Sequence, residues 1–457
     1  MKTKIYSLLL LLLGLLPGSI FAQTTYHYTD TDGLTWDFQL DGTGGATLRG
    51  VSGSLFTSES GGYTVFNKEV LRLPSNVSIG TNNYPVRELS LSFFKYKIEK
   101  VIIPATVNTP LSYSFSHTCI RRIETEPGCQ IPYLGSMALA GYLSEFPDPM
   151  EGALYFDFSD CPFVHYPWNS QFYETNDNTL LFTNAVSDVE YLYRRKSTFT
   201  RTDNIVRAGV CATLHIDDEE SFESPRTFTA TQASYDRVFS NVAGKAVSTL
   251  YLPYPTDLPN GMRAYTLIRK GFDENGDKAF CFAPVPAGTR LEAYKPYLVQ
   301  ITDGASHTLP TMHNVTVPAT PDIESTAVMA SADSDWKFYG TTLRIKNDKA
   351  YAKKAYYLNG NKWWAVQNGV TNDYIAPFRC FISSPTGAVP AKSFLMVLDE
   401  EDNNTTGIKS LENKTNEDIK SGKYPFYSVD GKLMGNDYNA LESGQIYIVN
   451  GKKFYKI

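Results

Sequence analysis

The sequence predicts a mainly β protein: a short β-solenoid built from repeats, then an antiparallel β-sandwich region and a small C-terminal β tail. Three observations lead to this fold class. Aromatic residues make up 13% of the 457 residues and charged residues only 20%, a balance that favours half-buried pleated surfaces. Apolar residues recur at a fixed spacing of 22 to 23 in the first third. Asn-Gly pairs, which favour tight β-turns, punctuate the rest.

Residues 1–22 have the features of a secretory signal. Lys2 and Lys4 precede an apolar run from Leu8 to Leu16, and Pro17-Gly18 leads to a small residue, Ala22. The alternative is a membrane anchor, but the run is shorter than the roughly 20 residues that span a bilayer. No later segment is apolar enough to span one as a helix. We therefore expect an exported protein, at the cell surface or outer membrane or in the medium.

The repeat appears when the chain is laid on itself. Each of four apolar positions recurs after 22 residues and again after a further 23. The three copies are Leu89, Phe93, Ile98 and Val101, then Leu111, Phe115, Ile120 and Ile123, then Leu134, Ala138, Leu143 and Phe146. This period predicts short strands that stack coil upon coil and bury a shared apolar row, unless the matches arise by chance in an apolar stretch.

A proline marks the end of a predicted strand at two places. The run Val101-Ile102-Ile103 stops at Pro104, which has no backbone N–H and a fixed φ, so the chain turns away there. Thirty residues earlier, Leu71-Arg72-Leu73-Pro74 has the same pattern.

These features resemble the BspA-like leucine-rich-repeat surface proteins. The hairpin-like run at 34–48 and G-T-N-N-Y-P-V-R-E-L at 80–89 add to the resemblance, which covers roughly residues 26–165. It implies a leucine-rich-repeat domain over residues 23–172 and a role in surface binding or adhesion. The repeats are few, so the adhesive surface of the family is expected to be shortened here.

Residues 173–400 predict one or two antiparallel β-sandwich subdomains. Hairpin turns are expected at Asn260-Gly261, Asn275-Gly276 and Asn359-Gly360. Stretches such as C-A-T-L-H-I at 211–216 and A-P-F-R-C-F-I at 376–382 resemble a scaffold module of secreted proteins from anaerobic Gram-negative bacteria.

A polar linker is expected over residues 401–423, because the segment has few large apolar residues. Residues 424–457 then predict two hairpin pieces, with turns at Asp430-Gly431 and Asn450-Gly451. This tail is similar to type IX secretion sorting domains, which implies contact with secretion machinery. The alternative is a plain terminal mini-sheet.

No motif in the sequence has the spacing of a catalytic site, and no enzyme activity or cofactor is expected. His117 with Cys119, and Cys211 with His215, are better explained as structural residues than as thiol-imidazole pairs. The acidic run at 217–220 is expected to be a solvated loop, and residues 273–277 a hairpin turn rather than a calcium loop.

Composition also limits the partners. A net charge of -6 provides no clustered basic face for nucleic acid. The six cysteines lack the spacing of zinc ligands, so no metal site is expected. Cys119 and Cys129 are the nearest pair in sequence and could form a disulfide after export, although free buried thiols explain the pattern equally well.

Two adjacent tryptophans give the candidate binding residues. Neighbouring side chains on a strand point to opposite faces, so either Trp363 or Trp364 is expected to look outward. Tyr356 and Tyr357 lie across the Asn359-Gly360 turn as their neighbours, and all four rings are candidates for stacking on a sugar or a partner protein. The alternative is that both tryptophans are covered by another sheet or domain.

The leading hypothesis is an exported, non-enzymatic protein that binds a host or bacterial surface protein or glycan. A second hypothesis is a glycan-binding accessory protein that uses the exposed aromatics. A third is a hydrolase whose carboxylates are brought together only by folding.

Overall fold

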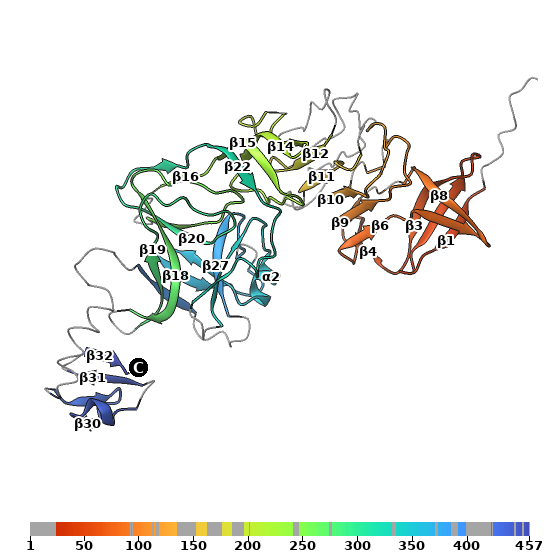
Figure 1. Cartoon of the computed structure of the whole chain (residues 1–457). Coiled ribbons are helices and arrows are strands. Elements are labelled where there is room, and N and C mark those ends of the chain that lie inside the picture. The colour runs from red at the N-terminus through yellow and green to blue at the C-terminus, as the bar shows by residue number, and fades with distance from the viewer. Residues whose placement is uncertain are drawn as a thin grey trace, which may run out of the picture. The chain divides into compact units, whose positions relative to one another are not determined.

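The protein is mainly β, as the sequence predicts (Figure 1). The computed structural model describes residues 24–456 except 92, 94, 112–113, 116–117, 135–151, 162–175, 185–195, 201, 241–245, 274–276, 331–334, 371–372, 385–391, 399–421, 423, 443–444 and 450–451. The expected signal at 1–22, nearly all of the linker at 401–423 and the boundary at 172–173 lie outside the described residues. The chain divides into two units, residues 1–142 with 160–173, and residues 143–159 with 174–457.

The first unit begins with a five-stranded sheet in the order β1-β2-β3-β8-β7. Its strands are β1 (Tyr26–Thr29), β2 (Thr35–Leu40), β3 (Ala46–Ser52), β7 (Asn76–Ile79) and β8 (Asn82–Leu89). Alternation on β2 buries Trp36 and Phe38 while the residues between them stay partly exposed. The indole N–H of Trp36 donates to Asp30 at 2.8 Å, which satisfies the only polar group of that ring.

The repeats form stacked strands, and this confirms the predicted register. The strands are β4 (Phe56–Glu59), β5 (Tyr63–Phe66), β6 (Val70–Arg72), β9 (Tyr96–Ile103) and β10 (Cys119–Thr125). In the parallel pair β9 and β10, Ile98 faces Ile120 and Val101 faces Ile123. Leu71 of β6 pairs with Val101 from the other side, so the near-copy at 71–74 is the rung next to 101–104.

Two further contacts continue the ladder beside the strands. Leu111 and Leu134 form a parallel bridge, and the rings of Phe93 and Phe115 stack at 5.6 Å. All four side chains are buried. The last positions of the third copy, Ala138, Leu143 and Phe146, lie outside the described residues.

In the second unit, parallel stacking continues beyond residue 172. The first strands are β11 (Tyr155–Asp157), β12 (Leu180–Thr183), β13 (Ile205–Arg207), β14 (Val210–Ile216), β15 (Phe228–Tyr235) and β22 (Met312–Val317). β11, β12 and β13 pair in parallel, and so do β14 and β15. The antiparallel strand β22 closes this series.

The rest of the second unit is a ten-stranded sheet that rolls over on itself. In sheet order its strands are β17 (Val247–Leu250), β20 (Tyr297–Ile301), β18 (Met262–Phe272), β19 (Lys278–Pro284), β28 (Ser393–Leu398), β26 (Lys362–Ala365), β25 (Tyr356–Asn359), β27 (Arg379–Ser383), β24 (Lys337–Thr341) and β23 (Val328–Met329). β17 and β27 lie far apart in the sheet order, yet the thiol of Cys380 in β27 lies 3.3 Å from the carbonyl oxygen of Leu250 in β17. The sheet therefore curls round so that these two strands meet. All the pairs are antiparallel except β19 with β28.

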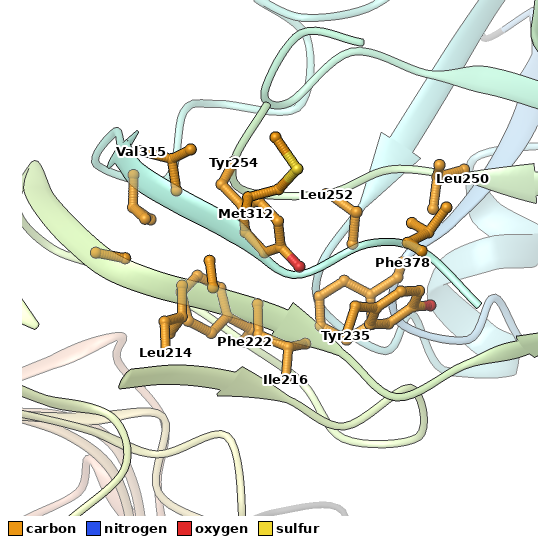
Figure 2. Close-up of a cluster of buried hydrophobic side chains, with 14 of the residues drawn as sticks. Leu214, Ile216, Phe222, Tyr235, Leu250, Leu252, Tyr254, Met312, Val315 and Phe378 are labelled. Carbon is orange, nitrogen blue, oxygen red and sulfur yellow. The ribbon is translucent and has the colours of Figure 1, made fainter. Parts of the chain in front are cut away.

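Smaller elements complete this unit. They are β16 (Val238–Phe239) paired with β21 (His307–Thr308), and helix α2 (Asn347–Ala352). A large apolar cluster lies between the β14-β15-β22 layer and the rolled sheet, and Figure 2 shows Leu214 and Phe222 facing Met312 and Leu252 within it. The interior of the rolled sheet holds a second, aromatic-rich cluster.

The C-terminal tail is a four-stranded antiparallel sheet in the order β30-β29-β31-β32. Its elements are β29 (Phe426–Ser428), β30 (Leu433–Gly435), the 3-10 turn η3 (Tyr438–Ala440), β31 (Ile446–Val449) and β32 (Lys452–Tyr455). Both predicted hairpins are present. The buried ammonium of Lys456 donates to the carbonyls of Tyr438 and Leu441 at 2.8 and 2.5 Å, which anchors the end of the chain to η3.

Candidate functional site

The hairpin β25-β26 holds the four aromatic residues singled out in the sequence. Asn359 pairs with Lys362, and the two residues between them, Gly360 and Asn361, have φ values of 60° and 61°. Such a two-residue turn with positive φ at both positions fits the twist of a hairpin. It lies one residue later than the expected Asn359-Gly360 turn.

On the inner face of this hairpin, Trp363 and Tyr356 are buried, with exposed fractions of 0% and 1%. Trp363 stacks on Phe282 at 6.0 Å and meets Phe338 edge to face at 5.8 Å. Neither ring can reach a ligand in this fold, so the predicted binding role is wrong for these two residues. The physical reason is the rolling of the sheet, which encloses the whole inner face.

On the outer face, Tyr357 and Trp364 lie directly opposite each other and are partly exposed. The hydroxyl of Tyr357 donates to Asp373 at 3.2 Å, and the indole N–H of Trp364 donates to the carbonyl of Asn359 at 3.0 Å. Burial and the nearby Asp373 carboxylate raise the pKa of Tyr357. Because the polar edge of each ring is already bonded, the ring faces are what this pair can offer to a ligand.

A network of hydrogen bonds fixes the loop beside these two rings. Asp373 accepts the backbone N–H of Gln367 at 3.0 Å. The side-chain amide of Asn347, at the start of α2, donates to the carbonyls of Gln367 and Asp373 at 2.8 Å each. The aromatic pair therefore lies on a preorganised frame, which lowers the entropy that binding has to overcome. Sequence reasoning missed Asn347 and Asp373, because neither belongs to a recognisable motif.

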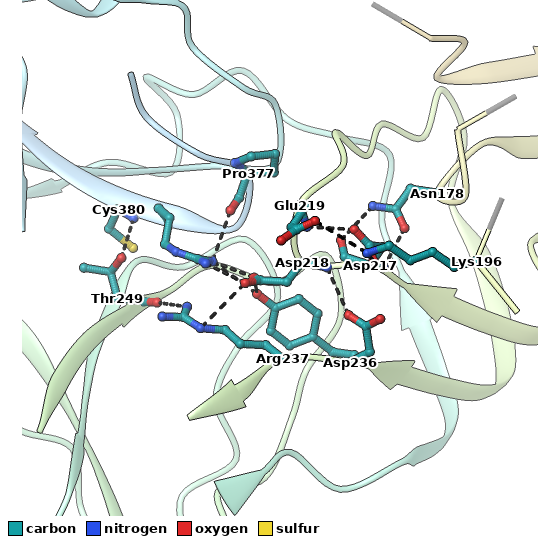
Figure 3. A network of polar contacts seen from close by, with 12 residues as sticks. Asn178, Lys196, Asp217, Asp218, Glu219, Asp236, Arg237, Thr249, Pro377 and Cys380 are labelled. Atoms are coloured by element: carbon teal, nitrogen blue, oxygen red, sulfur yellow. Dashed lines mark hydrogen bonds and ion pairs between the residues drawn. The ribbon is translucent and has the colours of Figure 1, made fainter. Parts of the chain in front are cut away.

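A second polar centre joins the β14-β15 layer to the rolled sheet (Figure 3). Arg379 contacts both carboxylate oxygens of Asp218 at 2.6 and 2.5 Å, and the hydroxyl of Tyr235 donates to the same carboxylate. Arg237 lies 3.8 Å from Asp218 and donates to the carbonyl of Thr249 at 2.9 Å. Burial opposes the charge on Arg379, but Asp218 outweighs it and raises the pKa of the guanidinium. These side chains are mutually satisfied, which suits a structural clamp rather than a reacting centre.

Buried amides connect successive turns of the chain near this clamp. Asn178 donates to the carbonyls of Asp217 and Glu220 at 2.9 and 2.7 Å, and it accepts the N–H of Asp217 at 2.7 Å. Asn204 donates to the carbonyl of His215 at 2.9 Å and accepts its N–H at 2.8 Å. The sequence analysis missed these residues, although the repeated Asp-Asn pairs at 177–178 and 203–204, each just before an apolar strand, are a signal that could have indicated them.

The acidic run at 217–220 is not a solvated loop, so that expectation was wrong. Asp217 and Glu220 are 0% and 5% exposed. Glu220 accepts the backbone N–H of Asp177, and Asp217 forms an ion pair with Lys196. Burial opposes the charge on Lys196, but Asp217 outweighs it and raises the pKa of the ammonium. The acids are therefore used to satisfy buried N–H and ammonium groups.

Cys211 and His215, which were weighed in the sequence as a thiol-imidazole pair, have different partners in the structure. His215 stacks on Phe199 at 3.9 Å and lies 3.7 Å from Asp203, whereas the thiol of Cys211 donates to the carbonyl of Thr213. The thiol and the imidazole thus have different partners. His117 lies outside the described residues.

Asp273 and Asp277 lie between the antiparallel strands β18 and β19, and residues 274–276 of the expected turn lie outside the described residues. The N–H of Asp277 donates to the Asp273 carboxylate at 2.8 Å. Within the described ranges, no group of three His, Cys, Asp or Glu side chains could hold a metal ion. Among the residues that the structure describes, no helix has the length and apolar character needed to cross a membrane.

The comparisons with known proteins give one match. The sequence matches no protein-family model, and no curated protein matches it. Among solved structures, the chain is similar to a leucine rich cell surface protein from Faecalibacterium prausnitzii, with 19% identity and a TM-score of 0.22. The match covers 59% of this chain and 66% of that protein, just under two thirds of its length.

Proposed function

We propose that this protein is exported and acts at the cell surface or in the medium as a non-enzymatic binding or adhesion protein. The observation that carries the proposal is the parallel register in which Ile98 lies on Ile120 and Val101 on Ile123. Stacked coils of this kind bury one row of side chains and expose another row across neighbouring strands. Solenoid proteins use such exposed rows as binding surfaces.

The exposed row here is a mixed-charge surface. Glu99 of β9 lies 3.0 Å from Arg122 of β10, and Lys100 lies 2.7 Å from Glu124. Lys97 extends the row to Glu59 of β4 at 3.0 Å. A surface with alternating charges gives a partner protein register and specificity through complementary charges. We call these six residues the charged row.

Export is supported by the signal-like residues 1–22 and by the separate tail sheet β29-β32. The test is fractionation of cells that carry either the full chain or a chain cut before Tyr424. Surface signal for the full chain alone is the expected result. An equal surface signal for both chains would contradict a sorting role for the tail, and retention of both inside the cell would contradict export.

A binding assay tests the function itself. Purified protein is applied to arrays of extracellular matrix proteins, bacterial surface proteins and glycans, and is also incubated with peptide and glycan substrates. We expect binding to at least one immobilised partner and no turnover. Hydrolysis that disappears when one carboxylate is replaced would overturn the non-enzymatic assignment.

A second candidate function, glycan binding, is favoured by the outward pair Tyr357 and Trp364. Both residues are partly exposed while their polar edges are bonded, and sugars present apolar C–H faces to such rings. The test compares Tyr357→Ala and Trp364→Ala with Tyr133→Ala, a matched change at a tyrosine of the first unit that is 39% exposed. Loss of glycan binding in the first two variants alone supports this candidate, and equal binding in all three contradicts it.

A further inference from the structure

Two buried thiols of the first unit, Cys129 and Cys161, each lie four residues past the end of a strand, β10 and β11. Cys129 follows β10 at the position that Val107 holds after β9, since both residues close the same turn. The N–H of Cys129 donates to the carbonyl of Glu126 at 3.1 Å, and the N–H of Val107 donates to that of Pro104 at 3.2 Å. The thiol of Cys129 also donates to the carbonyl of Val107 at 3.5 Å. Cys129 therefore packs against Val107 of the neighbouring coil.

The next contact of Cys129 is the thiol of Cys161. The partners of the Cys161 sulfur are the thiol of Cys129, the hydroxyl of Thr125 and the backbone N–H of Ile131. Both cysteines are 0% exposed. The contact with Cys161 and then burial raise the pKa of Cys129, while the contact with Cys129 lowers the pKa of Cys161.

Packing alone does not call for cysteine at these positions. The preceding rung has Val107, which is equally buried, and the position thirty residues earlier has Val77. An apolar side chain of modest size thus fills the rung. Two cysteines in contact add a property that two valines lack, which is the ability to form a covalent bond.

The nearest pair in sequence cannot form this bond. Cys119 begins β10 and pairs with Lys97, whereas Cys129 lies past the far end of β10, against Val107. β10 has seven residues, which separates its ends by about 20 Å at roughly 3.3 Å per residue. A disulfide needs Cα atoms within about 7 Å. The structure therefore rules out the pairing of Cys119 with Cys129.

We propose that Cys129 and Cys161 form a disulfide in the exported protein and thereby close a covalent loop around residues 130–160. One thiolate attacks the disulfide of an oxidant, and the second thiolate then displaces the oxidant's remaining sulfur. Each cysteine loses one proton and one electron, and the oxidant's disulfide is reduced to two thiols. The oxidant is a protein or small-molecule disulfide of the export compartment. Because both sulfurs are buried, the bond forms before or during folding.

This inference depends on the proposed export only for its oxidant. The contact between the two thiols is a property of the fold. Protein purified from the cytoplasm can be refolded with a mixture of reduced and oxidised glutathione, so the bond can be tested even if the export proposal fails. A failure to find the bond would, in turn, leave the fractionation result untouched.

The test is a disulfide map of the full chain. Free thiols are alkylated in denaturant without reduction, and the protein is cut after glutamate, because Glu145 and Glu151 separate the two cysteines whereas trypsin has no site between Arg122 and Arg194. We expect a linked peptide pair that contains Cys129 and Cys161 and that separates on reduction. The other four of the six cysteines should be alkylated. Alkylation of both Cys129 and Cys161, or a link from either one to another cysteine, would overturn the proposal.

Variants add a stability readout. Reduction should lower the Tm of the wild-type protein by about 5 °C, because the cross-link no longer restricts the unfolded chain. The double variant Cys129→Val/Cys161→Val, which copies the chemistry of the preceding rung, should lose this response. Cys211→Ser is the control and should keep it. An equal response to reduction in the double variant would contradict the proposal, and the peptide map of the wild-type protein decides the matter if that variant does not fold.

Discussion

The repeats of the first unit and the rolled sheet of the second unit both bury apolar cores, but they assemble them in different ways. In the repeats, the neighbour of a core residue is the same position one coil away, as with Leu71, Val101 and Ile123. In the rolled sheet, Trp363 is enclosed by Phe282 and Phe338, which no sequence period relates to it. The first core is a sum of similar rungs, and the second is a single closed cluster.

This difference predicts how each region responds to damage. In a stack of coils, each rung contacts only its neighbours, so the loss of one rung should remain local. In a rolled sheet, strands that are far apart in sequence share one interior, so the loss of one large side chain should affect the whole cluster. The following four predictions test this comparison, beginning with the largest expected effect.

The largest effect is expected for Trp363→Ala in the rolled sheet. Removal of a fully buried tryptophan leaves a cavity that its aromatic neighbours cannot fill, and should lower the free energy of unfolding by about 4 kcal/mol. Urea denaturation followed by circular dichroism measures the change. Trp364→Ala, one residue away on the outer face, is the control and should cost about 1 kcal/mol or less. Equal losses for the two variants would mean that the inner face is not closed.

The next effect is expected for Leu111→Ala in the repeats, at about 3 kcal/mol. Leu111 is fully buried and bridges to Leu134 on the next coil. Hydrogen exchange measured by mass spectrometry should show faster exchange in β9 and β10 and unchanged exchange in β17 and β20. Faster exchange in both units would contradict a local response.

The same contrast explains how much of the fold could be predicted from sequence. The register of Ile98 with Ile120 could be predicted, because a repeat places equivalent residues at one spacing and stacking then follows. The alternation of Trp363 and Trp364 also predicted that one ring would face inward. It did not say which one, because that depends on the strands that roll around the hairpin.

Contacts between distant residues could not be predicted. Asp218 and Arg379 are 161 positions apart, so no local pattern indicates their ion pair. The acidic run that begins at Asp217 was expected in solvent because four charged residues in a row are usually hydrated. Its burial follows from the N–H groups and the lysine that the folded chain brings to it. Asp373, the partner of Tyr357, could not be predicted either, since the loop that holds it follows no motif.

A smaller, pH-dependent effect is expected for Asp203→Asn in the second unit. Burial opposes ionisation of Asp203, but hydrogen bonds from His215 and Thr200 outweigh it and lower its pKa. A carboxyl group whose folded pKa is lowered stabilises the protein above its unfolded pKa of about 3.9, and this contribution is lost as the pH falls through the folded value. The variant should therefore lose about 2 kcal/mol at pH 7, and the difference from wild type should shrink below about pH 4.

Denaturation curves at several pH values measure this effect. Asp257→Asn is the control, because Asp257 also has a lowered pKa but forms its ion pair with Arg290 on the surface. The control should change stability by less than about 1 kcal/mol at any pH. A constant difference between wild type and Asp203→Asn across the pH range would show that the lost interaction is not ionic.

The smallest effect on stability is expected in the charged row of the repeats. Glu99 is 54% exposed and contacts Arg121 and Arg122 at 3.5 and 3.0 Å. Glu99→Ala should lower the free energy of unfolding by about 0.5 kcal/mol, and high salt should remove even that loss, because exposed ion pairs are screened.

If the charged row is the binding surface, the same variant should weaken partner binding severalfold. The salt-insensitive control Ile98→Val should change stability but not binding. Unchanged binding for Glu99→Ala would move the search for the partner site to the outer face of the β25-β26 hairpin, where Tyr357 and Trp364 are the residues to replace.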